Sequence, residues 1–275
     1  MESDAGSRGS AAEFYSALAP EYEGQFDVPH RKAYDTLCRE SVFRALQPGS
    51  FVVDVGCGVG RWATDLVTAG HRVLGIEPSP AMAAQAARLC VSERFELQEA
   101  DVDHAQVKAG SADVVLAMGS VQYAPEPCQS IATMASWLRP GGRLWVLVDS
   151  QQALIQELLR RGDYEEAAER ASVPIANLSY GSLVVEHHLF TSATIRAALE
   201  SAGLVEVEVS GLLVAWSSVP RGDAQTELSS RWTERLGVER DLSRVPELAD
   251  HGKQLLATGI AAPWAGGTAA RPGDI

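Results

Sequence analysis

Short apolar runs and stretches of helical spacing take turns along most of the chain. Runs rich in Val, Ile and Leu predict buried strands over residues 51–55, 72–77, 95–99, 111–118, 143–148, 183–190, 204–214 and 253–260. Apolar residues at steps of three and four predict helices over residues 12–26, 30–46, 62–69, 81–89, 127–138 and 193–202. Repeated strand and helix units of this kind build an α/β fold, a mostly parallel sheet with helices on both faces.

Two segments interrupt this alternation. Residues 149–181 are charge-rich with helical spacing, and residues 220–249 are polar and again helical. The sequence therefore predicts one domain over residues 11–260, with insertions at about 150–190 and 217–250. The first would be a lid-type insertion after the fifth strand. Small and polar residues dominate both ends, which predicts a disordered N-terminus over 1–10 and a flexible tail over 261–275.

The chain is organised around a glycine-rich turn that follows the first strand. One carboxylate, Asp54, interrupts that strand, and Gly56, Gly58 and Gly60 come directly after it. Glycine reaches positive φ cheaply, and its missing Cβ lets a ligand lie on the backbone. Turns between a strand and a helix are where open α/β sheets bind nucleotide-like ligands. Arg61 breaks the spacing of the dinucleotide fingerprint, and the Gly-Lys-Ser/Thr ending of a phosphate-binding loop is absent.

The pattern Asp-x-Gly-x-Gly-x-Gly, from Asp54 to Gly60, resembles the first motif of the class I S-adenosylmethionine-dependent methyltransferases of the small-molecule type. The segment from Tyr15 to Tyr22 and the Leu-x-Pro-Gly-Gly before residue 143 are similar to further features of that family. The resemblance implies a Rossmann-like, doubly wound sheet of seven strands, with the last strand antiparallel and helices at the N-terminus. It also implies in-line methyl transfer from S-adenosylmethionine to an oxygen or nitrogen of a small molecule. We expect a secondary metabolite, as in antibiotic biosynthesis.

Acidic residues after the strands complete the expected cofactor site. Glu77 ends an apolar strand 19 residues beyond Gly58, and an acid in that place can accept both hydroxyl protons of a ribose. The resemblance assigns the adenine amine to Asp101, with Asp103 as an alternative, and lets Val102 cover the ring. It places the remaining cofactor contacts at Tyr15, Tyr22, Arg31, Asp54, Gly56, Cys57, Gly58, Gly60, Pro78, Met118 and Ser120.

Three side chains are candidates for a general base. His187 and His188 are neighbours on a predicted strand, so their side chains point to opposite faces and at most one should enter the site. Histidine titrates near neutral pH, which suits removal of a hydroxyl proton. Tyr123, in the segment after the fourth strand, is the third candidate.

The composition excludes several classes of binding partner. The net charge of −13 among 275 residues opposes binding to a phosphate backbone, so we expect no nucleic acid. The N-terminus does not resemble a signal peptide, and no run of apolar residues is long enough to span a membrane, which together predict a cytoplasmic protein. The four cysteines contain no C-x-x-C pair, so neither a metal site nor a disulfide is expected. Nothing in the sequence indicates an oligomeric state.

Two other classes of function stay open on the sequence. A binding or regulatory module could keep the cofactor site and lack transfer activity. A nicotinamide-dependent oxidoreductase is disfavoured by Arg61.

Overall fold

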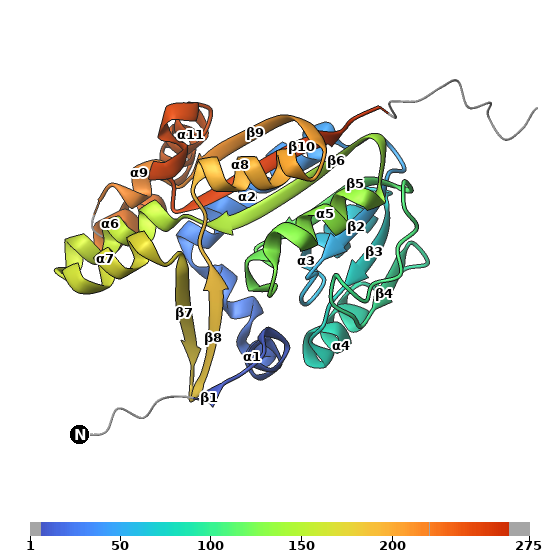
Figure 1. Cartoon of the computed structure of the whole chain (residues 1–275), viewed down its shortest axis with the longest axis horizontal. Coiled ribbons are helices and arrows are strands. Elements are labelled where there is room, and N and C mark those ends of the chain that lie inside the picture. The colour runs from blue at the N-terminus through green and yellow to red at the C-terminus, as the bar shows by residue number, and fades with distance from the viewer. Residues whose placement is uncertain (1–6, 220, 264–275) are drawn as a thin grey trace, which may run out of the picture.

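A seven-stranded sheet forms the centre of the computed structural model, which describes residues 7–219 and 221–263 (Figure 1). Its spatial order is β4-β3-β2-β5-β6-β10-β9, and only β10 runs antiparallel to its neighbours. This order and the antiparallel strand confirm the predicted Rossmann-like fold. The strands are β2 (Phe51–Val55), β3 (Arg72–Ile76), β4 (Phe95–Gln98), β5 (Ala112–Met118), β6 (Leu138–Asp149), β9 (Leu204–Leu212) and β10 (Gln254–Ala261).

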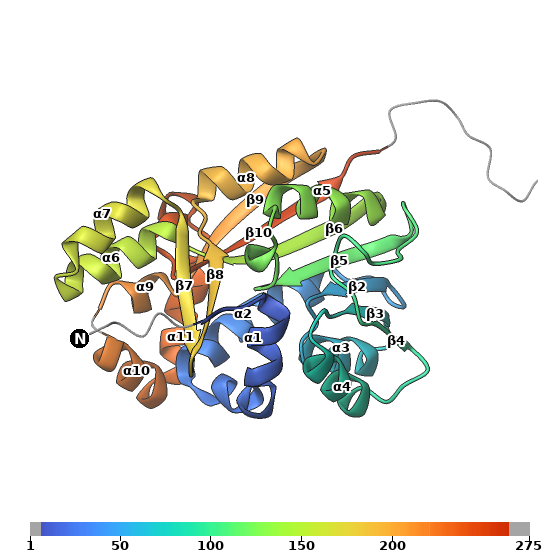
Figure 2. The same ribbon diagram turned by 60° about the horizontal axis from the view of Figure 1, so that its bottom comes forward.

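Helices cover both faces of the sheet (Figure 2). Alternate side chains of β6 show why: Leu144 and Val146 pack with the helices of one face, whereas Trp145 and Leu147 pack with those of the other. The first face carries α5 (Pro127–Trp137) and α8 (Ser192–Ser201), and the second carries α2 (Pro29–Ala45), α3 (Arg61–Thr68), α9 (Val214–Ser217), α10 (Arg221–Ser230) and α11 (Trp232–Leu242). The helix α4 (Pro80–Leu89) connects β3 to β4, and the short helix η4 (Pro246–His251) precedes β10.

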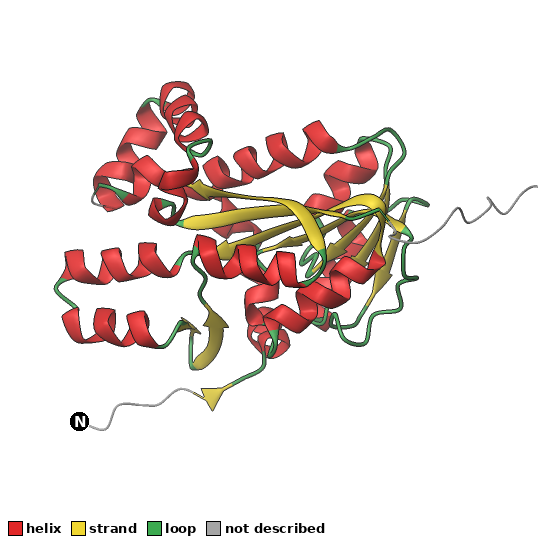
Figure 3. Ribbon diagram, turned by 45° about the horizontal axis from the view of Figure 1, so that its top comes forward, coloured by secondary structure: helices red, strands yellow, loops and turns green. Residues whose placement is uncertain are grey.

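A second, three-stranded sheet lies beside the N-terminal helix α1 (Ala11–Leu18), as Figure 3 shows. Its strands are β1 (Ser7–Arg8), β8 (Leu183–His188) and β7 (Ile175–Tyr180). The strand β8 agrees with the sequence, but β7 falls in a stretch predicted to be helical, and that prediction was wrong there. The helical prediction holds for α6 (Gln151–Arg161) and α7 (Tyr164–Ser172) in the same insertion.

The chain enters this structure earlier than expected. Ser7 and Arg8 pair with Leu183 and Val184 in parallel, although the sequence predicted disorder up to residue 10. The reason is that β8 offers an open edge that a short extended segment can join. The predicted tail began at residue 261, but Ala261 is the last residue of β10. Residues 1–6 and 264–275, which make up most of the predicted disordered start and tail, lie outside the described residues. Within the described residues, no helix is long and apolar enough to cross a membrane.

Candidate active site

A cavity of about 480 Å³ opens at the carboxyl ends of β2, β3 and β5. The glycine turn and the residues after these strands line it, which is where a parallel sheet of this kind binds ligands. Predicted contacts in its wall are Tyr15, Tyr22, Gly56, Gly58, Glu77, Pro78, Asp101, Val102, Met118 and Ser120. The structure therefore brings ten of the predicted cofactor residues to one cavity.

The glycines of the turn have different structural reasons. Gly56 has φ +67°, and a Cβ there would lie 2.3 Å from Cβ of Ser120. Gly58 lies under the ring of Tyr22, whose Cε1 would be 3.7 Å from an added Cβ. Gly60 borders neither this cavity nor the larger one described below, and instead allows α4 to approach, since a Cβ there would lie 3.2 Å from Cα of Ala86. Gly56 and Gly58 are thus the bare backbone that faces a ligand.

Glu77 contributes a carboxylate to the wall of the cavity. Its carboxylate is buried and accepts hydrogen bonds from the amides of Gly58 (2.8 Å) and Ser79 (2.9 Å). Burial raises the pKa of Glu77, and the two backbone hydrogen bonds oppose that rise. Each carboxylate oxygen keeps a second lone pair that can accept from a ligand hydroxyl.

We expect Glu77→Ala to weaken binding of S-adenosylmethionine, the predicted cofactor, about tenfold, because one or two hydrogen bonds to the ligand are lost. Calorimetric titration measures the change. Glu96→Ala is the matched control, since Glu96 is exposed on β4 and borders neither cavity. Equal affinities of the Glu77 and Glu96 variants would reject the role of Glu77.

Asp54 lies behind the turn rather than on its surface. The side chain is buried, and its Oδ2 has no hydrogen-bond partner among the described residues. Burial, with a smaller contribution from the charge of Glu77, raises the pKa of Asp54 to about 7. A carboxyl group that holds its proton near neutral pH can donate as well as accept.

Asp101 lies at the rim of the cavity. Its side chain is 52% exposed, and Oδ1 accepts from the amide and from Nδ1 of His104 (3.0 and 2.6 Å). This hydrogen bond raises the pKa of His104. The second carboxylate oxygen accepts no hydrogen bond from the described residues and is available to an adenine amine.

A second, larger cavity of about 640 Å³ shares part of its wall with the first. The shared wall contains Tyr15, Tyr22, Met118 and Tyr123. The ring of Tyr15 lies edge-on to Tyr22 and Tyr123, with centroids 6.1 and 5.3 Å apart. Burial, then the neighbouring phenols of Tyr123 and Tyr22, hold the pKa of Tyr15 well above its usual value. The aromatic segment near the N-terminus therefore forms a neutral partition between the two cavities.

The larger cavity also contains His187, which comes from β8. His187 is buried, its Nε2 lies 3.6 Å from Oδ2 of Asp149, and its ring lies 5.6 Å from that of Tyr123. Burial lowers the pKa of His187, the carboxylate of Asp149 opposes this, and His188 adds a small further lowering. His188, on the other face of the strand, borders neither cavity.

Asp149 and Gln122 were missed by the sequence reasoning. The amide Nε2 of Gln122 donates to Oδ2 of Asp149 (3.1 Å), and Oε1 of Gln122 accepts from the backbone amide of Asp149 (2.9 Å). Asp149 ends the apolar strand β6 just as Glu77 follows the apolar strand β3, so the same signal could have found it. Of the four remaining predicted cofactor contacts, Arg31, Asp54 and Cys57 line this larger cavity, whereas Gly60 borders neither cavity.

Comparison with known proteins decides the family. A model of the methyltransferase domain matches residues 53–146. A ubiquinone biosynthesis O-methyltransferase from Xanthomonas axonopodis pv. citri is 30% identical over 200 residues, which cover 69% of this chain and 78% of the relative. The chain belongs to the class I S-adenosylmethionine-dependent methyltransferases. Membership confirms the predicted cofactor and the predicted class of enzyme.

Solved structures of methyltransferases share the fold. One is the methyltransferase in complex with the Haloferax volcanii Trm112 activator, with a TM-score of 0.63 at 22% identity over 94% of this chain and 100% of that one. Another is a Haemonchus contortus phosphoethanolamine N-methyltransferase bound to S-adenosylmethionine, with a TM-score of 0.61 at 14% identity over 90% of this chain and 57% of that one.

The smaller cavity of this methyltransferase fits its cofactor. Bare backbone at Gly56 and Gly58 admits a ligand, Glu77 offers buried lone pairs to a ribose, and Asp101 offers an exposed oxygen to a base. S-adenosylmethionine-dependent methyl transfer to a small molecule is the activity of this chain. The larger cavity shares a wall of tyrosines with the smaller one and is large enough for an acceptor.

Proposed function

We propose that this methyltransferase methylates a hydroxyl oxygen of its small-molecule acceptor, with His187 as the general base. The observation that carries the proposal is the pair of His187 and Asp149 in the wall of the larger cavity, 3.6 Å apart. A hydroxyl benefits from a partner that removes its proton, whereas a neutral amine already carries a free lone pair. The activity of the Xanthomonas relative, an O-methyltransferase, supports oxygen as the methylated atom.

The environment of His187 suits a base. Because burial lowers its pKa, the imidazole is neutral at pH 7 and can accept a proton at Nε2. The resulting imidazolium lies beside the carboxylate of Asp149, which stabilises the new charge. Gln122 holds Asp149 in place through two hydrogen bonds, one to its carboxylate and one from its backbone amide.

The roles of the chain in the reaction follow from this arrangement. When bound, S-adenosylmethionine supplies a methyl group on a positively charged sulfur. The acceptor oxygen forms a bond to that methyl carbon as the carbon–sulfur bond breaks, the electron pair stays on sulfur, and the hydroxyl proton passes to His187. The partition of Tyr15, Tyr22 and Tyr123 excludes water and orients the acceptor, an effect that can supply ~7 to 11 kcal/mol in favourable cases.

The test is a competition between oxygen and nitrogen on one molecule. Incubation with ortho-aminophenol and S-adenosylmethionine, followed by mass spectrometry and NMR of the product, shows which atom carries the methyl group. We expect the O-methyl product, and a product methylated on nitrogen alone would contradict the proposal.

That the natural acceptor is a secondary metabolite of antibiotic biosynthesis stays a prediction, as does the cytoplasmic location.

The pH profile should respond to Asp149. In the parent enzyme, kcat should rise with pH as His187 loses its proton and level off above its pKa, which lies below the ordinary value of 6.5. Because the carboxylate raises this pKa, Asp149→Asn should move the acid limb to lower pH and also lower the plateau. Rates at saturating hydroxyl acceptor from acid to neutral pH measure both changes. An acid limb that stays in place would show that Asp149 does not act through His187.

A further inference from the structure

The larger cavity carries an unusual set of basic side chains. His30 and Arg31 lie in the first turn of α2, Arg61 begins α3, and Lys253 directly precedes β10. The first turn of α2 also presents the positive end of a helix, and its N-cap residue, Val28, makes no side-chain capping bond. These segments are far apart in the sequence and meet at one cavity.

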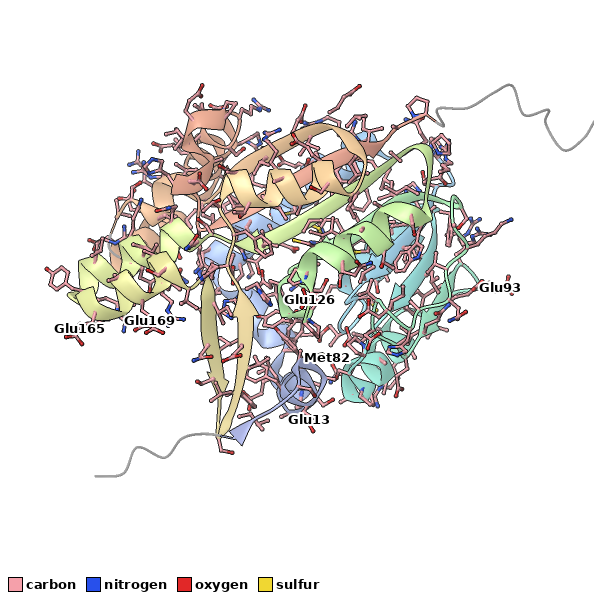
Figure 4. All side chains as sticks on the ribbon, viewed as in Figure 1. Glu13, Met82, Glu93, Glu126, Glu165 and Glu169 are labelled. Atoms are coloured by element: carbon pink, nitrogen blue, oxygen red, sulfur yellow. The ribbon has the colours of Figure 1, made fainter. Side chains whose placement is uncertain are left out.

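The rest of the molecule has the opposite charge. The chain has a net charge of −13, and the glutamates Glu93, Glu165 and Glu169 lie at its outer edges in Figure 4. The wall of the larger cavity also contains three acids, Asp35, Asp54 and Asp149. An anionic ligand is therefore indicated by those cations of the wall that have no carboxylate partner, and not by the sign of the whole lining.

The basic side chains of this cavity differ in whether they have a carboxylate partner. Arg61 forms an ion pair with Asp35 at 2.7 Å. Among the described residues, no carboxylate lies within 4.0 Å of the charged groups of Arg31 or Lys253. Arg31 lies near Tyr22, where its charge opposes the rise in the pKa of that phenol, and Tyr22 borders the cofactor cavity. The sequence assigns Arg31 to the carboxylate of the cofactor, and that role stays a prediction. With Arg31 assigned in this way, Lys253 is the cation of this wall that has no anionic partner among the described residues.

Lys253 is held on an aromatic platform. Its Nζ lies 5.5 Å from the ring centroid of Trp216, and the imidazole of His30 stacks on the same indole at 5.0 Å with an interplanar angle of 25°. Nδ1 of His30 lies 3.3 Å from Oε1 of Gln225, which helps to fix the ring. Trp216 is buried, so it brings an ammonium and an imidazole together at a defined place in the wall.

We propose that the methyl acceptor carries a carboxylate and that Lys253, beside His30 and the first turn of α2, binds it. The inference rests on the proposed function, because it names the substrate class of the same site. One lysine with a neighbouring imidazole suits a single negative charge, whereas a phosphate would favour the forked donors of arginine. The acceptor would then lie with its anionic end at Lys253 and its hydroxyl at His187.

Binding measurements on the full chain test this without methyl transfer. The enzyme is first saturated with S-adenosylhomocysteine, which occupies Arg31, and is then titrated calorimetrically with para-hydroxybenzoate or with para-hydroxybenzyl alcohol. We expect the benzoate to bind about tenfold more tightly, as one charge-assisted hydrogen bond would give. Lys253→Met should abolish this preference, and Lys253→Arg should retain it. The affinity for S-adenosylhomocysteine should not change in either variant.

The matched control is Lys108→Met, since Lys108 is exposed and borders neither cavity. This variant should keep the full preference for the benzoate. The proposal is overturned if the benzoate binds no better than the alcohol, if it fails to bind, or if Lys253→Met keeps the preference. A failure of the proposed general base leaves these titrations unaffected, because His187→Ala should still prefer the benzoate.

Discussion

Replacing His187 with alanine should lower kcat for a hydroxyl acceptor about 10²- to 10⁴-fold, the usual contribution of a general base. The loss arises because no other described group in the larger cavity combines a neutral proton acceptor with a carboxylate 3.6 Å away. Initial rates at saturating acceptor and cofactor measure the change. The affinity for S-adenosylmethionine should stay at the parent value, since His187 does not border the cofactor cavity.

The neighbouring histidine supplies the control for this variant. His188 lies on the opposite face of β8 and borders neither cavity, so His188→Ala should keep the parental kcat. His187→Gln preserves most of the buried volume and should be as slow as His187→Ala, which separates loss of the base from loss of packing. Tyr123→Phe tests the third candidate. If none of these three positions affects turnover, the chemistry relies on positioning alone.

Gly56→Ala should abolish most cofactor binding and destabilise the fold. The added Cβ would lie 2.3 Å from Cβ and 2.9 Å from Oγ of Ser120, whose hydroxyl donates to the carbonyl of Val55 at 2.6 Å. Overpacking of this kind costs about 1 to 3 kcal/mol beyond the strain of a positive φ. A shift of the turn by that overlap should weaken binding of S-adenosylmethionine tenfold or more, at ~1.4 kcal/mol for each factor of ten. Calorimetry and thermal unfolding measure both effects.

Gly110 is a closely matched control for Gly56. Its φ is +66°, against +67° for Gly56, and nothing lies within 4 Å of an added Cβ. Gly110→Ala should therefore show the backbone strain, about 1 to 2 kcal/mol, without any loss of cofactor affinity. Equal cofactor affinities of the two variants would mean that the turn at Gly56 tolerates a side chain.

The main sheet could be predicted from the sequence because each of its strands shows its burial in its own run of apolar residues. Val53 and Val55 pack on one face of β2 and Val52 on the other, as a strand buried on both faces requires. The strand β7 could not be predicted in the same way. Only one of its six residues, Ala176, is buried, and β7 is a strand because it pairs with β8 in antiparallel register. Pairing with a distant partner overrides local pattern in such short segments.

The residues of the candidate site also fall into two groups, those that a local pattern predicts and those that only the pairing of distant segments brings together. Gly56 and Glu77 belong to a contiguous strand and turn pattern, so their place in the cofactor cavity could be predicted. Asp149, at the end of β6, and Lys253, just before β10, border the same cavity because the two strands pair in antiparallel register, with Gln254 opposite Asp149. No short-range spacing in the sequence shows that the two residues line one cavity. His187 could be named only as one of two neighbours, since the choice depends on which face of β8 meets the cavity.

We expect the methyl group to be transferred where the two cavities meet, within reach of His187. A crystal structure of the chain with S-adenosylhomocysteine shows whether the cofactor lies in that place. We predict the sulfur beside Tyr15, Tyr22 and Met118, with open volume between it and Nε2 of His187. A sulfur turned away from that volume, or a ligand that avoids the turn at Gly56, would contradict the account.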